Sequence, residues 1–322
     1  MKHRILGRTG LAVSEIGFGC GTTAGLMIHA APAVRRMAVE RALALGIDYF
    51  DTAPIYGDGL SEVHLGEALR DIGAKPVVAT KVALFAADLA DIRGAVTRSV
   101  EASLKRLGMP RIDVIQLHNR IGHVRAATAP FGSGALLAVD DVLGPVAGAF
   151  AALRRRGLAG FFGCSTYGGD PAAVAAVVDS GAFDVATVNY SMLNPSAWEP
   201  SVAGLRDYGQ IGARAAAAGL GTVGLRVLEG GILAAPDGRP PSGADSDPDF
   251  VQLMAKAHRF ADRCRAVGLD PGEAAIRFAL GNPAVSTVLL GVSNVGQIED
   301  AARFAANGPL DPAVLASLGF ER

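Results

Sequence analysis

The chain has 322 residues, of which half are hydrophobic and 6% aromatic, and its 30 basic and 31 acidic side chains leave a net charge of −1. Because no basic stripe appears, nucleic acid and anionic membrane are poor candidate partners, and no apolar run reaches the roughly 18 residues of a membrane span. The N-terminus lacks the apolar stretch of a signal peptide, and Cys20, Cys164 and Cys264 form no closely spaced pair. We therefore expect a reduced, cytoplasmic protein.

Strand-like and helix-like segments alternate along the whole chain. The first element is a hairpin of residues 4–7 and 11–13, joined by a Gly-Arg-Thr-Gly turn. Strands are then expected at residues 15–19, in a segment that ends at Asp51, and at residues 77–80, 113–116, 161–164, 185–188, 222–227 and 286–290. Helices are expected at residues 33–45, 61–69, 91–107, 140–156, 171–179, 211–218, 250–267, 271–280 and, as the last helix, 297–306. Such alternation favours a parallel sheet, and eight repeats favour its closure. The sequence thus predicts a single domain over residues 1–322, a (β/α)8 TIM barrel with an N-terminal β-hairpin.

Three predicted connections are longer than ordinary loops, namely residues 119–139, 192–210 and 235–249. The first two follow strand ends, so we expect them to overhang the rim of the barrel and to shape substrate choice. The third is polar and rich in Pro and Gly, which predicts a mobile or partly disordered segment. A lid over a bound cofactor is the alternative for this third connection.

Four polar residues follow the carboxyl ends of three consecutive predicted strands: Asp51, Tyr56, Lys81 and His118. The carboxyl rim is where (β/α)8 barrels carry out their chemistry. Taken singly, each has an ordinary structural explanation, as a turn cap, a turn aromatic, a solvated charge or a loop histidine. Their joint placement on one rim instead indicates a catalytic set suited to reducing a carbonyl.

Carbonyl reduction by a nicotinamide requires a hydride donor and a proton for the developing alkoxide. Tyr56 can give that proton, but the ordinary tyrosine pKa of about 10 is high for work near neutrality. We expect the ammonium group of Lys81 to lower the pKa of Tyr56 by roughly 1–3 units. Asp51 can then fix Lys81, and His118 can orient the carbonyl oxygen. General acids of this kind accelerate reactions by about 10²–10⁴-fold.

A competing interpretation comes from the glycines after the first barrel strand. Residues 19–24, Gly-Cys-Gly-Thr-Thr-Ala, match the G-x-G-x-x-A form of the Rossmann fingerprint, with Asp51 as its ribose-binding acid. However, the expected helix does not begin directly, and Asp51 is farther than the usual spacing of about 20 residues. The barrel is the favoured interpretation.

The motifs resemble those of the aldo-keto reductases. They are Asp51-Thr-Ala with Tyr56-Gly, Ser61-Glu62, Thr80-Lys81, residues 113–118 ending in His118, Gly163-Cys-Ser165 and Gly291-Val-Ser293. The resemblance covers essentially the whole chain. It implies a barrel that binds NADP(H), less often NAD(H), and acts on a small-molecule carbonyl or sugar substrate. Tyr56 would be the proton donor, with Lys81, Asp51 and His118 completing a tetrad, and no metal would take part.

The same resemblance implies a cofactor site at the strand ends. Its residues would be Gly19, Cys20, Ser165, Thr166, Thr187, Leu225, Arg226, Leu228, Gly291, Ser293, Gln297 and Asp300.

This implied site departs from the family pattern at several positions. Thr166 stands where the family commonly has Asn, Thr187 where it has Gln, and Leu225 where it often has an aromatic. Arg226 replaces the usual Ser. Its planar fork could pair with the cofactor pyrophosphate, with an acidic substrate, or within the barrel wall.

The last cofactor segment, residues 291–300, precedes a predicted helix whose first N–H groups can hold a phosphate. Gln297 and Val292 stand where many members place a cation against the 2′-phosphate, so the choice between NADP(H) and NAD(H) is open. Asp300 would face the adenine or favour the first turn of its helix.

Three alternatives to carbonyl reduction follow from the sequence. One is an NAD-linked sugar or alcohol dehydrogenase working in the oxidative direction. Another is a slow-turnover nucleotide-binding regulatory subunit, as in channel-associated members of the family. A third is a metal-dependent barrel enzyme that uses His118 with His123. In each case the substrate contacts are expected from the long loops, where the candidates are Arg120, Arg125, Trp198 and Tyr208, and the oligomeric state stays open.

Overall fold

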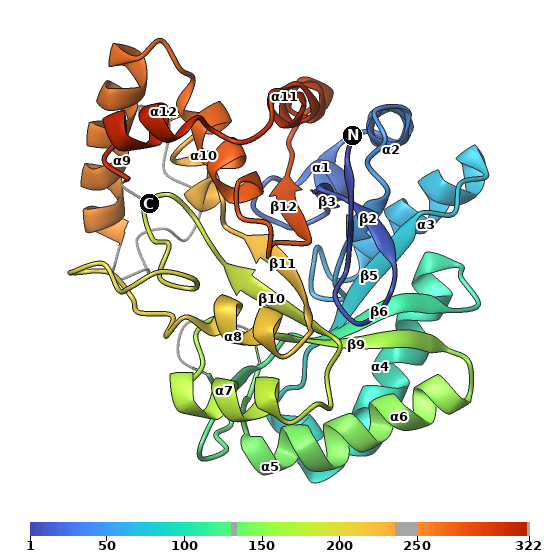
Figure 1. Ribbon diagram of the computed structural model, residues 1–322. Coiled ribbons are helices and arrows are strands. Elements are labelled where there is room, and N and C mark those ends of the chain that lie inside the picture. The colour runs from blue at the N-terminus through green and yellow to red at the C-terminus, as the bar shows by residue number, and fades with distance from the viewer. Residues whose placement is uncertain (130–133, 236–249, 321–322) are drawn as a thin grey trace.

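The computed structural model describes residues 1–129, 134–235 and 250–320. Eight parallel strands form a closed barrel in which each strand pairs with the next along the chain and the last pairs with the first (Figure 1). They are β3 (Ile16–Gly19), β4 (Tyr49–Asp51), β5 (Val77–Val82), β6 (Ile112–Leu117), β9 (Ala159–Ser165), β10 (Val185–Asn189), β11 (Gly221–Leu225) and β12 (Thr287–Gly291). The predicted barrel is confirmed, and its closure excludes the open Rossmann sheet.

Helices surround the strands in Figure 1. They are α2 (Pro32–Ala44), α3 (Leu60–Ile72), α4 (Ile92–Leu107), α6 (Ala147–Arg155), α7 (Pro171–Asp179), α8 (Ile211–Ala217), α9 (Phe250–Ala266), α10 (Pro271–Leu280) and α11 (Val295–Ala306). Several starts follow from local chemistry: the Asp170 and Asp270 carboxylates accept hydrogen bonds from the first-turn N–H groups, with Pro as the next residue. Asp caps and Pro at the first helical position are strong start signals, and they explain why these boundaries were predicted closely.

The predicted hairpin is confirmed as β1 (His3–Ile5) paired with β2 (Ala12–Ser14). It closes one end of the barrel, because Leu6 and Val13 join inward-facing strand residues in a buried apolar cluster. The strand members of this cluster are Tyr49, Ala79, Val114, Val185, Val223 and Leu289. The Arg4 guanidinium fastens the hairpin to the barrel by donating to the carbonyls of Leu280, Asn282 and Val285.

Several elements differ from the sequence prediction. The helix expected at residues 140–156 is α5 (Val139–Asp141), a π-helical turn η2 (Val142–Val146) and α6, because Pro145 lacks the N–H needed for a regular turn. The predicted last helix is followed by another, α12 (Pro312–Ser317). Short elements were also missed: α1 (Leu26–His29), η1 (Ala86–Ala90), η3 (Glu229–Gly231), and the paired β7 (Arg120–Gly122) and β8 (Leu136–Ala138).

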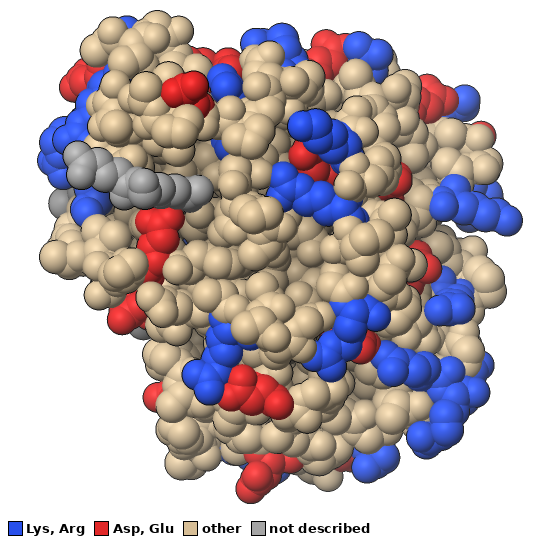
Figure 2. All heavy atoms as spheres, in the orientation of Figure 1, with Lys and Arg blue, Asp and Glu red and all other residues tan. Residues whose placement is uncertain are grey.

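Two of the long connections lie partly outside the described residues, at positions 130–133 and 236–249. The mobile-segment or lid prediction for residues 235–249 therefore falls almost wholly outside them. Among the helices that are described, none has the length and apolar character to cross a membrane. On the face shown in Figure 2, basic and acidic side chains are interspersed with uncharged surface.

Candidate active site

Three neighbouring strands bring the four predicted catalytic residues together. Asp51 ends β4, Lys81 lies near the end of β5, and His118 directly follows β6. The sequence predicted that Lys81 follows its strand. Because β5 runs to Val82, Lys81 instead lies within the strand. These strands pair in parallel, so their carboxyl ends meet at one rim. Tyr56 reaches the same place from the turn after β4.

Lys81 is at the centre of the group. Its ammonium pairs with the Asp51 carboxylate, donates to the Thr52 carbonyl at 2.8 Å, and lies 4.9 Å from the centroid of the Tyr56 ring. The rings of Tyr56 and His118 meet edge to face, with centroids 6.0 Å apart. A cation, a phenol and an imidazole thus face one another at the rim.

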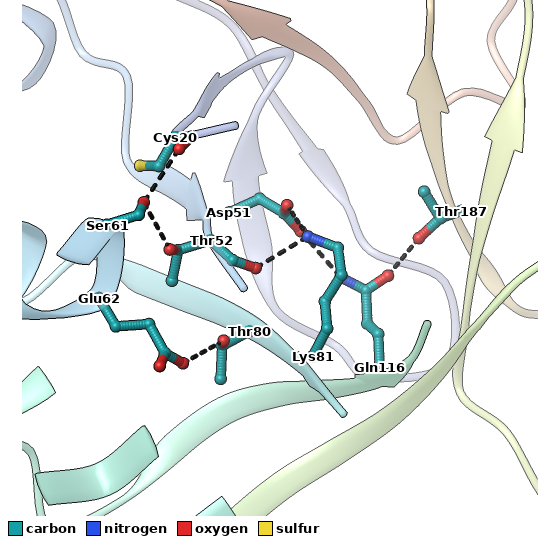
Figure 3. A network of polar contacts seen from close by, with 9 residues as sticks. All are labelled: Cys20, Asp51, Thr52, Ser61, Glu62, Thr80, Lys81, Gln116 and Thr187. Atoms are coloured by element: carbon teal, nitrogen blue, oxygen red, sulfur yellow. Dashed lines mark hydrogen bonds and ion pairs between the residues drawn. The ribbon is translucent and has the colours of Figure 1, made fainter. Parts of the chain in front are cut away.

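A chain of buried polar side chains supports Asp51 (Figure 3). The Gln116 amide donates to Asp51 Oδ2 at 2.8 Å, and the Thr187 hydroxyl donates to the Gln116 carbonyl oxygen. Asp51, Gln116 and Thr187 are all at most 2% exposed. The sequence gave Gln116 no role, and it assigned Thr187 to the cofactor. In the structure, the Thr187 hydroxyl holds the group that orients Asp51.

A second set of hydrogen bonds fixes the segment that carries Tyr56. The Thr52 and Ser61 hydroxyls are 2.8 Å apart, and Ser61 donates to the Cys20 carbonyl at 2.9 Å. The next residue, the buried Glu62, accepts from Thr80 and from Arg106, each at 2.6 Å. Since Ser61 and Glu62 lie in the first turn of α3, these contacts tie the segment after β4 to the end of β3, to β5 and to α4.

Burial dominates the proton affinity of Tyr56. It raises the pKa of the phenol above the ordinary value, although the Lys81 charge acts in the opposite direction. Lys81 thus acts on the pKa of Tyr56 in the expected direction, but the effect of burial is larger, and the sequence could not show it. Burial also disfavours the charged form of Lys81, but Asp51 and Tyr56 together outweigh it and hold the lysine pKa above its usual range. Lys81 is thus a permanent cation.

His118 is a neutral imidazole near neutrality. Burial, together with the positive charges of Lys81 and Arg120, lowers its pKa to about 3. Its Nδ1 atom is buried and has no hydrogen-bond partner among the residues that the structure describes. A neutral imidazole suits hydrogen bonding to a carbonyl oxygen better than it suits salt-bridge formation.

A cleft of about 720 Å³ opens beside Tyr56 and runs over the ends of β11 and β12. Its volume is within the range of small-molecule and cofactor sites. Eight of the predicted cofactor residues line it: Gly19, Leu225, Arg226, Leu228, Gly291, Ser293, Gln297 and Asp300. The sequence missed other lining residues, which include Thr23, Ala24, Asp270 and Phe304.

The remaining predicted cofactor residues do not line this cleft within the described parts of the chain. The Cys20 thiol is buried in the core, and burial raises its pKa. Thr166 donates to the Thr187 carbonyl at 2.9 Å, and Ser165 is 8% exposed at the end of β9. These residues lie at the rim as expected, but their side chains face the barrel wall or interior.

The start of α11 can hold an anion at the cleft. Asn294 caps the helix by accepting from the Gln297 N–H at 3.0 Å, and the Gln297 amide oxygen accepts from the Ser293 N–H at 2.8 Å. The N–H groups of Val295 and Gly296 have no partner in the described residues, so they can donate to a phosphate. The Gln297 side chain thus folds back onto its own loop, and Asp300 pairs with Arg303 at 2.7 Å.

The structure also places the residues of the other predictions. His123 pairs with Asp170 at 3.1 Å, and among the described residues no three His, Cys, Asp or Glu side chains gather as metal ligands. Of the four candidate substrate contacts, Tyr208 lines a small pocket with Arg226, and Arg120 lies nearby over Tyr167. Trp198 packs against Tyr190, and Arg125 pairs with Asp141.

The fold and the site together define a (β/α)8 barrel with Asp51, Tyr56, Lys81 and His118 gathered at its carboxyl rim beside a cleft of cofactor size. Residues 15–319 match the model of the aldo/keto reductase family. The chain belongs to this family and is an NAD(P)H-dependent oxidoreductase.

Curated and solved relatives agree with this assignment. The chain is 27% identical to L-galactose dehydrogenase of Arabidopsis thaliana, over 93% of this chain and 86% of that protein. It is 29% identical to pyridoxal 4-dehydrogenase of Microbacterium luteolum, over 92% and 91%. An aldo-keto reductase of Bacillus halodurans, solved in its holo form, has a similar fold, with a TM-score of 0.74 and 22% identity over 99% of this chain and 95% of that one.

Proposed function

We propose that the protein reduces an aldehyde or ketone to the alcohol, with Tyr56 as the proton donor. The observation that supports this most is the placement of the Lys81 ammonium and the neutral His118 ring around the Tyr56 ring, beside the cleft. When bound there, reduced nicotinamide supplies the hydride. The carbonyl carbon accepts the hydride, the π electron pair moves to oxygen, and the oxygen takes the Tyr56 proton.

Each residue of the site has a physical part in this step. Lys81 stabilises the phenolate that Tyr56 becomes, which solvent then reprotonates, and Asp51 keeps Lys81 in place. His118 donates a hydrogen bond to the carbonyl oxygen, which fixes the substrate and stabilises the charge that develops there. The α11 N–H groups hold a cofactor phosphate, and Leu225 and Leu228 supply apolar contact.

The test is Tyr56→Phe, assayed with aromatic aldehydes and either reduced nucleotide. We expect kcat to fall by about 10²–10⁴-fold, with NADPH and NADH affinities from fluorescence quenching unchanged. Tyr49→Phe is the matched control, because its hydroxyl is buried without a partner in the described residues and belongs to the barrel core. A Tyr56→Phe protein with full activity contradicts the proposal. Nucleotide binding without any turnover favours the regulatory-subunit alternative.

A second candidate is the same chemistry in the oxidative direction with NAD. It is supported by the Gln297 side chain, which holds its own loop where a cation against the 2′-phosphate was expected. The relatives from Arabidopsis thaliana and Microbacterium luteolum are both named dehydrogenases. Turnover of sugars or alcohols with NAD⁺ and not NADP⁺ would select this direction. Tyr56 would then remove the hydroxyl proton.

A further inference from the structure

Three guanidinium groups gather around one aromatic ring next to the candidate active site. The guanidinium carbons of Arg120, Arg226 and Arg206 lie 4.1, 5.3 and 5.6 Å from the centroid of the Tyr167 ring. A ring face attracts a cation, but gathering three like charges around it is electrostatically unfavourable. Burial and the charges of Arg206 and Arg226 lower the pKa of Arg120 to about 10.

The fold builds this arginine cluster from four separate segments. Arg120 starts β7 just after β6, Tyr167 follows β9, Arg226 follows β11, and Arg206 lies in the long connection after β10. Since β6, β9, β10 and β11 are consecutive in the barrel, their carboxyl ends bring these segments to one sector of the rim. Local chemistry also fits: Arg120 donates to the Tyr167 carbonyl at 2.6 Å. A Cβ at Gly168 would lie 2.6 Å from Arg120 Nε, so glycine makes room for this side chain.

The arginine cluster lies next to the proposed catalytic residues, and its three arginines differ in how exposed they are. Arg120 is two residues after His118, and its charge is among those that lower the pKa of His118. Arg120 is 9% exposed, Arg206 is half-buried, and Arg226 is open to solvent. Arg226 and Glu229 line both the main cleft and a small pocket shared with Tyr167 and Arg206. The cluster therefore extends from the neighbourhood of His118 to the exposed Arg226 at the cleft.

We propose that Arg120, Arg206 and Arg226 bind a carboxylate or phosphate group carried by the carbonyl substrate. The proposal rests on the proposed reductase function and narrows its substrate class to anionic aldehydes or ketones. Guanidinium forks match the planar oxygens of carboxylates and the oxygens of phosphates, often with two hydrogen bonds at once. An anion would also offset the repulsion among the three cations. Glu229, which accepts from the Ser191 hydroxyl, brings one carboxylate to the pocket that Arg206 and Arg226 line.

The position of the cluster favours the substrate over the cofactor as the source of this anion. The cofactor cleft extends past Gly291, Ser293 and Gln297 toward α10 and α11. Tyr167 and Arg206 do not line that cleft within the described residues, but line the small pocket on the side of β9 and β10. Arg226, predicted from the resemblance to contact the cofactor, lines both the main cleft and the small pocket and so lies where they meet.

The experiment compares matched substrates. Values of kcat/KM are measured for 4-carboxybenzaldehyde against benzaldehyde, and for glyceraldehyde 3-phosphate against glyceraldehyde. We expect the wild-type protein to prefer at least one anionic partner by about 10- to 100-fold, the range of charge-assisted hydrogen bonds, and the pair that shows it identifies carboxylate or phosphate. Arg206→Gln should reduce that ratio about 10-fold. Arg98→Gln removes the same charge from an exposed ion pair on α4 and should leave this kcat/KM ratio unchanged.

Two outcomes overturn the proposal. One is a ratio near one for both pairs in the wild-type protein. The other is a ratio that survives Arg206→Gln while the NADPH dissociation constant rises, because that assigns the cluster to the cofactor. If no aldehyde is turned over, calorimetric titration with benzoate and inorganic phosphate decides separately. Binding that Arg206→Gln weakens about 10-fold supports the anion site although the reductase proposal fails; absence of binding rejects the anion site too.

Discussion

The side-chain amide of Gln116 donates a hydrogen bond to Asp51 Oδ2 at 2.8 Å, on the opposite carboxylate oxygen from the one that pairs with Lys81. This contact uses the second oxygen of Asp51 and fixes the plane of the carboxylate. The Thr187 hydroxyl in turn fixes the Gln116 amide. The orientation of Lys81 therefore depends on residues of four strands.

We expect Gln116→Met to lower kcat by about 10-fold with little change in KM, because an apolar side chain leaves Asp51 free to rotate and Lys81 less well placed. A positioning role predicts more than a loss of rate: the high-pH limb of the kcat profile should also move, since it reports Tyr56 next to Lys81. Thr187→Val should lower kcat less than Gln116→Met does, and Thr187→Ser, which keeps the hydroxyl, should have the wild-type kcat. Unchanged profiles in Gln116→Met would show that the contact is only structural.

The partly buried His118 makes stability depend on pH. Its pKa is near 6.5 in the unfolded chain and about 3 in the folded protein. Between these values the unfolded state binds one more proton, so this contribution to stability is complete above pH 6.5 and is lost as the pH falls toward 3. From pH 8 to pH 5 the free energy of unfolding should drop by about 2 kcal/mol through His118 alone.

Urea titrations at several pH values can isolate this contribution. His118→Asn should lack it, so the wild-type and variant curves should converge as the pH falls. The exposed His123→Asn should keep the wild-type slope and serves as the control. Parallel curves for wild type and His118→Asn between pH 8 and pH 5 would be incompatible with a depressed pKa.

Nucleotide preference should depend on position 297. Gln297 now accepts hydrogen bonds from the Ser293 N–H and hydroxyl and carries no charge. Gln297→Arg should place a cation at the mouth of the cleft and strengthen NADPH binding by about 10-fold relative to NADH, the scale of a charge-assisted hydrogen bond to phosphate. Fluorescence titration with both nucleotides measures the ratio. An unchanged ratio would mean that the 2′-phosphate, where present, lies elsewhere. Gln297→Met is the uncharged control.

The sequence predicted the barrel because eight strands and their helices left a clear alternation, and because Asp and Pro mark several helix starts. It predicted the placement of Asp51, Lys81 and His118 because strand ends in a parallel barrel share one rim. Their catalytic roles remain proposals. Several elements of three to six residues outside the β/α alternation, such as β7 and α12, were missed, because segments this short do not show a periodic pattern of their own.

Other features of the site had no sequence signal. Gln116 lies within an apolar strand, so its sequence context is that of a core position. Only the folded structure shows that its side chain points to Asp51. The pKa of Tyr56 depends on burial, which the neighbouring residues in the sequence do not show. The arginine cluster unites positions 120, 206 and 226, and nothing local relates them. Such features arise from tertiary contacts, and only the folded chain displays them.

The ion pair between Glu62 and Arg106 should be a large contributor to stability. The Glu62 side chain is fully buried, while Arg106 is 29% exposed, and their atoms approach to 2.6 Å. In Arg106→Gln the buried Glu62 carboxylate would be stabilised only by the Thr80 hydroxyl and by the N-terminal end of α3, where Glu62 lies. We expect the free energy of unfolding to fall by about 2–3 kcal/mol, somewhat below the loss from breaking a fully buried pair.

Restoring neutrality should recover much of this loss. In Glu62→Gln/Arg106→Gln the uncompensated charge is gone, and Thr80 can still hydrogen-bond the new amide, so the double variant should be more stable than Arg106→Gln alone. Arg98→Gln, which breaks an exposed pair with Asp91, should cost less than about 1 kcal/mol. Thermal and urea unfolding of the wild-type protein and these three variants measures the differences in stability. Equal losses in Arg106→Gln and the double variant would show that Arg106 acts through packing and not through the charge of Glu62.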